Sequence, residues 1–176
     1  MTKYINAFVF SFILITLAGC ATQELPESWK PLTKLVERKD LPGVGDGVVT
    51  TISPNLYVKD IDDFWEDYPI GSVQHESLRR HELEHAKDQE EFIGDAKGIH
   101  RKARMTLWIK KYLTDKNFRW EVEKKGYKAG IQYERSMGVQ INPEVYASIL
   151  SGKTYNDMVS YEEALEWVRK IYSGQE

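Results

Sequence analysis

The sequence predicts an α+β fold that is mostly α, in which a small β-sheet precedes a long helix and several further helices. Residues 48–59 are rich in β-branched side chains, which favour strands. Beyond residue 71, capping residues and prolines mark the starts of helical segments that cover most of the chain. The 176 residues, with 41% hydrophobic and 29% charged side chains, are enough for one globular domain with its own core.

The start of the chain has the pattern of an export signal. Lys3 gives a short positive region, and residues 7–17 form an apolar run that is too short to span a membrane readily. The run ends in the letters LAGC at residues 17–20, which resemble the lipobox of bacterial lipoproteins. In that family the signal peptide is cut before the cysteine, and the thiol is lipidated. The resemblance implies a signal peptide over residues 1–19 and a mature chain that begins at lipidated Cys20.

Lipidation at Cys20 implies a protein held on a membrane, because each buried CH₂ group of an acyl chain contributes about 0.8 kcal/mol. Cys20 is the only cysteine, so the lipidated chain keeps no thiol for catalysis or metal binding. Residue 21 is alanine rather than aspartate, which by the sorting pattern of Gram-negative lipoproteins implies the periplasmic face of the outer membrane, if the cell has one. The alternative is an ordinary signal peptide or membrane anchor with an incidental cysteine. The net charge of −3 shows no broad basic excess, so nucleic acid is not an expected partner.

The segment between Cys20 and the first helix is expected to contain a tether and then a small sheet. Residues 20–47 hold three of the six prolines, which favours a tether and loop with one short helix near residues 32–38. Residues 48–59 predict two short strands with a turn between them. The acidic and aromatic residues 60–69 predict a loop.

Five helices are expected in the rest of the functional domain, which spans residues 48–176. Their starts are marked by a serine N-cap, by an asparagine followed by proline, and by a serine–glutamate capping box. The expected helices cover residues 72–92, 101–113, 117–136, 143–151 and 160–172.

The first long helix carries the motif H-E-x-x-H at His81, Glu82 and His85. Histidines four residues apart on a helix point the same way, so both imidazoles can reach one zinc ion. The glutamate projects from the edge of the same face, where it can contact a water molecule without binding the metal. On a helical wheel the three residues share one face with Leu78, Ala86, Gln89, Phe92 and Ile93, and Glu84 lies on the opposite face.

Burial of two imidazoles and a carboxylate on this face costs several kcal/mol unless they are paired or bind a metal. The wheel therefore favours a metal site, and the alternative is a surface helix whose polar groups align by chance. A catalytic zinc site needs a third protein ligand and keeps one position for water. The sequence has no histidine after His85 at the spacing of metzincins.

The segment WEVEKKGY at residues 120–127 resembles the glutamate helix of gluzincin-type metallopeptidases. With the upstream strands and the motif helix, the resemblance covers residues 48–136. It implies that Glu121 is the third zinc ligand, in preference to Glu123. Two weaker candidates are Glu134 and His100.

These patterns lead to the hypothesis of a lipid-anchored, zinc-dependent metallopeptidase of the bacterial envelope. His81, His85 and Glu121 are expected to hold Zn²⁺, and Glu82 is expected to act as general base for the water that attacks a peptide bond. The expected partners are a peptide or protein substrate and the membrane. One alternative is a non-enzymatic envelope lipoprotein with a structural or vacant metal site. Another is a latent enzyme whose cleft is covered by residues 23–47 or by the C-terminal helices.

Other polar and aromatic side chains near the motif are expected to have structural roles. His75 is expected to make an ordinary hydrogen bond at the helix end, and Tyr127 and Tyr133 are expected to pack in the core. The aromatic cluster of residues 64–68 is expected to pack over the sheet. The basic residues between 101 and 111 are expected to form a solvated helix face or to approach anionic lipid.

Overall fold

The structure is a computed structural model that describes residues 21–38 and 48–175. The expected signal peptide, Cys20 and residues 39–47 of the expected tether lie outside the described residues. None of the described helices is long and apolar enough to cross a membrane.

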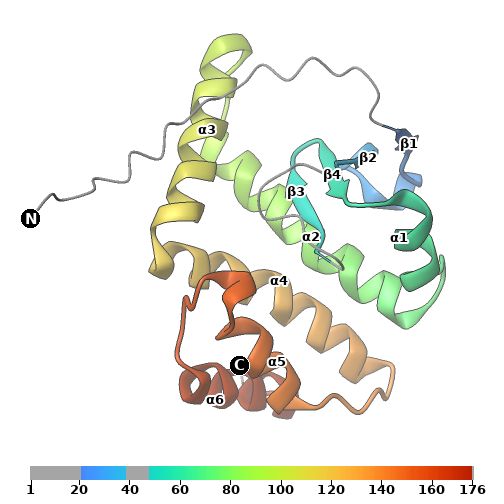
Figure 1. Cartoon of the computed structure of the whole chain (residues 1–176), viewed down its shortest axis with the longest axis vertical. Coiled ribbons are helices and arrows are strands. Elements are labelled where there is room, and N and C mark those ends of the chain that lie inside the picture. Colours follow the sequence, from blue (N-terminus) through green and yellow to red (C-terminus); the bar gives the residue numbers. More distant parts are fainter. Residues whose placement is uncertain (1–20, 39–47, 176) are drawn as a thin grey trace, which may run out of the picture.

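Four short strands form one sheet in the order β1-β2-β4-β3 (Figure 1). β2 runs parallel to β4, whereas β1 pairs antiparallel with β2 and β3 pairs antiparallel with β4. The two strands expected within residues 48–59 are therefore confirmed as β3 and β4. The strand bounds are β1 (Thr22–Glu24), β2 (Lys34–Glu37), β3 (Thr50–Ile52) and β4 (Asn55–Val58).

Residues 21–38 belong to the folded domain, so the expectation of a tether is wrong for this part of the chain. A short 3₁₀ helix, η1 (Glu27–Trp29), connects β1 to β2 and places Trp29 in the core with no exposed surface. The helix expected near residues 32–38 is also wrong, because this segment forms β2 and pairs along both of its edges. β4 lies about twenty residues further along the chain, so a local pattern could not reveal the pairing.

Six α-helices follow the sheet in the described part of the chain, so the fold is α+β and mostly α, as expected. Five of them match the expected helices to within a few residues. The sixth, α1, was expected to be a loop, but Asp60 accepts hydrogen bonds from the N–H groups of Asp62 and Asp63 and caps it. The helix bounds are α1 (Ile61–Asp67), α2 (Val73–Ile93), α3 (Gly98–Thr114), α4 (Lys116–Ser136), α5 (Pro143–Leu150) and α6 (Tyr161–Ser173).

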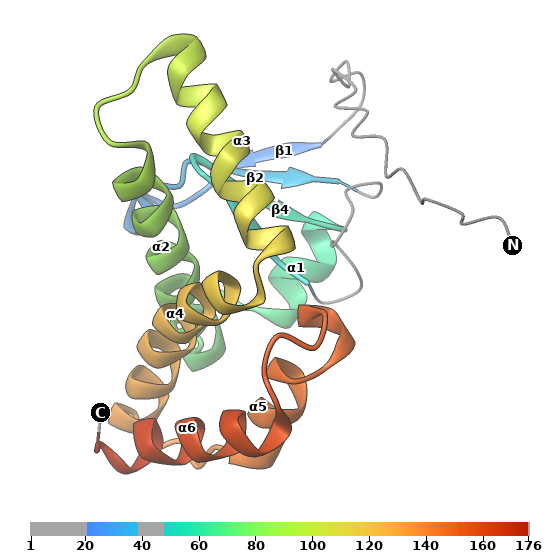
Figure 2. The ribbon, with the colours of Figure 1, turned by 90° about the vertical axis from the view of Figure 1, so that its left-hand side faces the viewer.

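Two hydrophobic cores lie on either side of the helix pair α2 and α4 (Figure 2). One joins the sheet, α1 and α2, and the other joins α4, α5 and α6. α2 and α4 approach closely because α4 has glycines at the contact. A Cβ atom at Gly126 would lie 2.9 Å from the ring of His81, and one at Gly130 would lie 2.8 Å from the hydroxyl of Ser77. The contact between the two helices therefore contains the first histidine of the motif.

The face of α2 that was expected to point inward is buried, which confirms the prediction from the helical wheel. Its buried members include Glu82, His85, Ala86, Gln89 and Ile93. Phe92 is the exception, because 38% of its surface is exposed in the last turn of the helix.

His75, in the first turn of α2, accepts a hydrogen bond from the indole of Trp29 over 3.3 Å. Burial lowers the pKa of His75 below its ordinary 6.5, and Arg79 adds to this while Glu76 opposes it. The unfolded chain therefore takes up this proton before the folded protein does. His75 therefore contributes a decrease in the free energy of unfolding as the pH drops through the range of about 7 to 5, whereas a histidine whose pKa is raised, such as His85, contributes in the opposite direction.

Chemical denaturation at a series of pH values measures this dependence. His75→Gln should remove the contribution of His75, and His100→Gln, at an exposed position on α3, is the matched control. An equal effect of the two substitutions would contradict this role for His75.

Candidate metal centre

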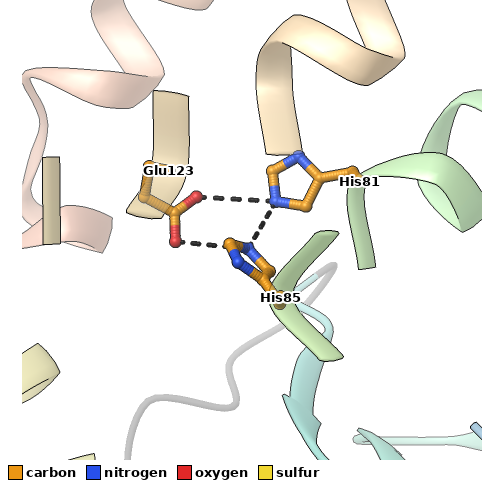
Figure 3. Close-up of side chains that lie close together, drawn as sticks. All are labelled: His81, His85 and Glu123. Atoms are coloured by element: carbon orange, nitrogen blue, oxygen red, sulfur yellow. Dashed lines mark hydrogen bonds and ion pairs between the residues drawn. The ribbon is translucent and has the colours of Figure 1, made fainter. Parts of the chain in front are cut away.

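Three side chains from two helices converge between α2 and α4 (Figure 3). His81 and His85 come from successive turns of α2, and Glu123 comes from the second turn of α4. The Nε2 atoms of the two histidines lie 2.8 Å apart. The Glu123 carboxylate lies 3.5 Å from Nε2 of His81 and 3.4 Å from Nε2 of His85. Within residues 21–38 and 48–175, this cluster contains three side chains that can ligate a metal.

Glu123 and His85 are buried, and His81 is largely so, and the charges of these side chains affect one another. Only 2% of the Glu123 side chain is exposed, against 12% for His81 and 11% for His85. Burial would raise the pKa of Glu123, but the imidazoles of His85 and His81 hold it well below its usual range. Burial would likewise lower the pKa of His85, but the Glu123 carboxylate outweighs this effect and raises it to about 9. The metal-free site therefore holds a carboxylate beside a protonated imidazole.

The donor set fits a zinc ion. Ligand atoms on tetrahedral zinc, with bonds of about 2.0–2.1 Å, lie about 3.3 Å from one another. Each imidazole lies at about this spacing from one oxygen of Glu123, His81 from Oε2 and His85 from Oε1, and the two imidazoles need to separate slightly to reach it. Oε2 of Glu123 is buried and has no hydrogen-bond donor. Because such an atom is costly to bury, a cation at this position would satisfy it.

The position of the third carboxylate differs from the expectation. Glu121 points into solvent, with 64% of its side chain exposed, and pairs with Lys124 at 2.7 Å. The structure brings Glu123, and not Glu121, to the two histidines. The preference for Glu121 is thus corrected in favour of the alternative.

Helix geometry explains why Glu123 reaches the site. Gly126 and Gly130 mark the face of α4 that packs against α2. Glu123 precedes Gly126 by three residues and lies on the same face, whereas Glu121 precedes it by five and lies on another. The spacing of glycines at a close helix contact was the signal in the sequence that could have identified the ligand.

Glu82 lies beside the cluster and faces the sheet. Its Oε2 accepts a hydrogen bond from the hydroxyl of Thr51 in β3 over 2.7 Å, and only 3% of the residue is exposed. Its negative charge contributes to the raised pKa of His85. Gln89, two turns later on α2, accepts from the N–H of Ser53 and donates to the carbonyl of Thr51, both over 2.8 Å. These contacts hold β3 against α2 at the position of Glu82.

No protein-family model, curated protein or solved structure matches this chain. The similarity to gluzincin-type peptidases and to lipoproteins therefore stays a prediction from the sequence.

Tyr112, which the sequence analysis did not identify, holds Glu123 in place. Its hydroxyl donates to Oε1 of Glu123 over 2.5 Å. Burial and the neighbouring carboxylate raise the pKa of the Tyr112 hydroxyl, so it stays protonated and remains a donor. The ring of Tyr112 stacks on Trp108 at 5.3 Å, which fixes its direction. Tyr112 lies on a different helix from both halves of the site, so no spacing in the sequence connects it to Glu123.

We expect Tyr112→Phe to lower the affinity for zinc by about 10–100-fold, the usual effect of removing a hydrogen bond to a metal ligand. Competition with a chromophoric chelator measures the affinity. Tyr172→Phe is the matched control, because the hydroxyl of Tyr172 donates to the carbonyl of Val139, in the C-terminal core away from the site. Equal affinities of the Tyr112 variant and the parent would contradict the positioning role.

The structure places the other candidate residues outside the set of three ligands. Glu134 accepts hydrogen bonds from Ser77 and Tyr146, and His100 is exposed on α3. Tyr127 packs edge-on against the ring of His81 at 4.6 Å, and Tyr133 lies under the guanidinium of Arg80. The aromatic cluster of residues 64–68 packs against the sheet, as expected.

Proposed function

We propose that this chain is a lipid-anchored, zinc-dependent peptidase, in which His81, His85 and Glu123 hold the metal. The observation that carries the proposal is the convergence of the motif histidines on one buried carboxylate, with Glu82 directly beside them. A structural zinc site is closed by four protein ligands, whereas a catalytic site has three and leaves a position for water. The cluster contains three side chains that can bind the metal, which is the number of protein ligands in a catalytic zinc site.

Zinc bound at this site would lower the pKa of a water molecule to about 7 and polarise the carbonyl of a peptide bond. Glu82 would accept the proton of this water molecule. Thr51 holds one oxygen of its carboxylate, so the other oxygen is the one that accepts a proton from the attacking water. The same carboxyl group then returns the proton to the leaving amine.

β3 is the strand that would align an extended substrate. It lies at the edge of the sheet and contacts Glu82 through Thr51. Gln89 already occupies the carbonyl of Thr51 and the N–H of Ser53. A peptide that pairs with β3 would therefore use the backbone before these two groups.

The experiment is a cleavage assay on a library of random peptides, with the full chain loaded with zinc. Mass spectrometry should detect new termini that disappear when a chelator is added and return when zinc is restored. Failure of the chain to bind zinc would overturn the metal site. Stoichiometric zinc without any cleavage would overturn the peptidase and leave the second candidate.

That second candidate is a non-enzymatic envelope lipoprotein with a structural zinc ion. The low exposure of the three ligands favours it, because a structural site does not need to admit substrate. Tyr155, at the end of the 3₁₀ helix η2 (Lys153–Tyr155), is partly buried, and its hydroxyl lies 3.0 Å from that of Tyr127, which packs on the ring of His81. This segment therefore lies near the metal site.

A further inference from the structure

Helix α3 has an apolar face that points away from the protein. Ile99, Leu107 and Leu113 are 73%, 57% and 52% exposed, and Ala103 between them is also exposed. Their spacing places them on one side of the helix. Trp108, the buried residue of α3, lies on the opposite side and packs against the body of the domain. α3 is thus a helix with one face inside the fold and a second apolar face on the surface.

The same helix is strongly basic in a chain whose net charge is −3. Its seventeen residues contain five lysines and arginines and no aspartate or glutamate. Arg101 and Arg104 face the body, where they bind Glu90 and the carbonyl of Ile93. Lys102 and Lys110 are exposed and lie next to the apolar residues. The outer face of α3 therefore combines apolar side chains with positive charges.

Both views show where α3 lies in the molecule. The sheet, including the start of β1, and the first turns of α3 lie at one end, and α5 and α6 lie at the other (Figures 1 and 2). A single residue, Ala21, separates Cys20 from β1. A lipid on Cys20 would therefore hold the end of the domain that carries α3 close to the bilayer.

We propose that the outer face of α3 lies on the surface of an anionic lipid bilayer. Ile99, Leu107 and Leu113 would insert among the headgroups and upper acyl chains, and the neighbouring lysines would pair with lipid phosphates. A second copy of the chain would bind this face less well than a bilayer does. Two such faces would bring like charges together, and α3 has no acidic residue to pair with them. The proposal goes beyond the proposed peptidase and uses from it only the anchor.

The test places an environment-sensitive fluorophore on single introduced cysteines in the full chain. Leu107→Cys reports on α3, and Val145→Cys, 52% exposed on α5, is the matched control at the other end. The parent chain, whose only cysteine is Cys20, is labelled in parallel to give the background. The chains are reconstituted in vesicles of phosphatidylcholine alone or mixed with an equal part of phosphatidylglycerol.

At position 107 we expect a blue-shifted emission that is quenched by nitroxide-labelled lipid in the anionic vesicles, and that weakens at high salt. Position 145 should show neither effect. Lys102→Gln with Lys110→Gln, on the Leu107→Cys background, should reduce the ratio of docked to undocked helix faces by about fivefold for each charge removed.

Equal signals at the two positions, or no response of position 107 to anionic lipid, would overturn the proposal and point to an acidic protein partner instead. The readout needs neither zinc nor peptide cleavage, so loss of the peptidase proposal would leave this result unaffected.

Discussion

Glu123→Gln is expected to lower the affinity for zinc by more than about 100-fold, because residues that merely support a metal ligand already contribute 10–100-fold. Glutamine has the size of glutamate and can still accept the hydrogen bond of Tyr112, so the fold should persist. Its neutral amide oxygen is a poor substitute for a carboxylate as a zinc ligand. Zinc content by atomic emission and competition with a chelator measure the loss.

The matched control is Glu121→Gln, which makes the same chemical change two residues earlier on α4. Glu121 is exposed and pairs with Lys124, so zinc binding should stay at the level of the parent. Exposed ion pairs contribute little to stability, so the control should also unfold at the same denaturant concentration. Loss of zinc in the Glu121 variant, with retention in the Glu123 variant, would reverse the assignment of the third ligand.

Zinc binding has a consequence for protons at the same site. In the metal-free protein Glu123 raises the pKa of His85 to about 9, so at neutral pH this imidazole carries a proton. An imidazole must be neutral to bind zinc, so binding of the metal would release that proton. In the metal-free protein, Glu123 and the protonated His85 attract each other. Zinc would replace this attraction with a bond from the metal to each of the two side chains.

The motif helix could be read from the sequence because its information is local. His81, Glu82 and His85 belong to one amphipathic stripe, and the structure buries that stripe as the wheel predicts. The capping residues of α2 and α6 likewise act on their own helices, with Ser72 accepting from the N–H of His75 and Ser160 from that of Glu163. Features that depend on neighbours within a few residues were therefore predictable.

The features that the sequence did not reveal depend on contacts between distant segments. β2 is a strand because β1 and β4 pair with both of its edges, and its own residues do not require this. The apolar residues of α4 left Glu121 and Glu123 equivalent, because two faces of this helix are buried. The contact with α2 through Gly126 and Gly130 decides between them. Tyr112 joins the site from a third helix, so its role depends on the packing of α3.

Glu82→Gln is expected to lower the rate of peptide cleavage by about 10²–10⁴-fold, the usual contribution of a general base. The amide keeps the size of the carboxylate and can still accept the hydrogen bond of Thr51, but it cannot take up the proton of water. Glu82 is not among the three clustered ligands, so zinc should stay bound at the level of the parent. Loss of activity with retained metal separates a catalytic role from a structural one.

Glu84→Gln is the control within the same motif. Glu84 lies on the outer side of α2, with 34% of its side chain exposed and Lys87 at 3.9 Å, so its substitution should change neither cleavage nor zinc content. Cleavage that survives in the Glu82 variant would assign the proton transfer to another group. Loss of zinc together with activity would instead make Glu82 part of the metal site. Only an inactive, zinc-loaded Glu82 variant beside an active Glu84 variant supports the mechanism, because the two glutamates differ in which side of α2 they occupy.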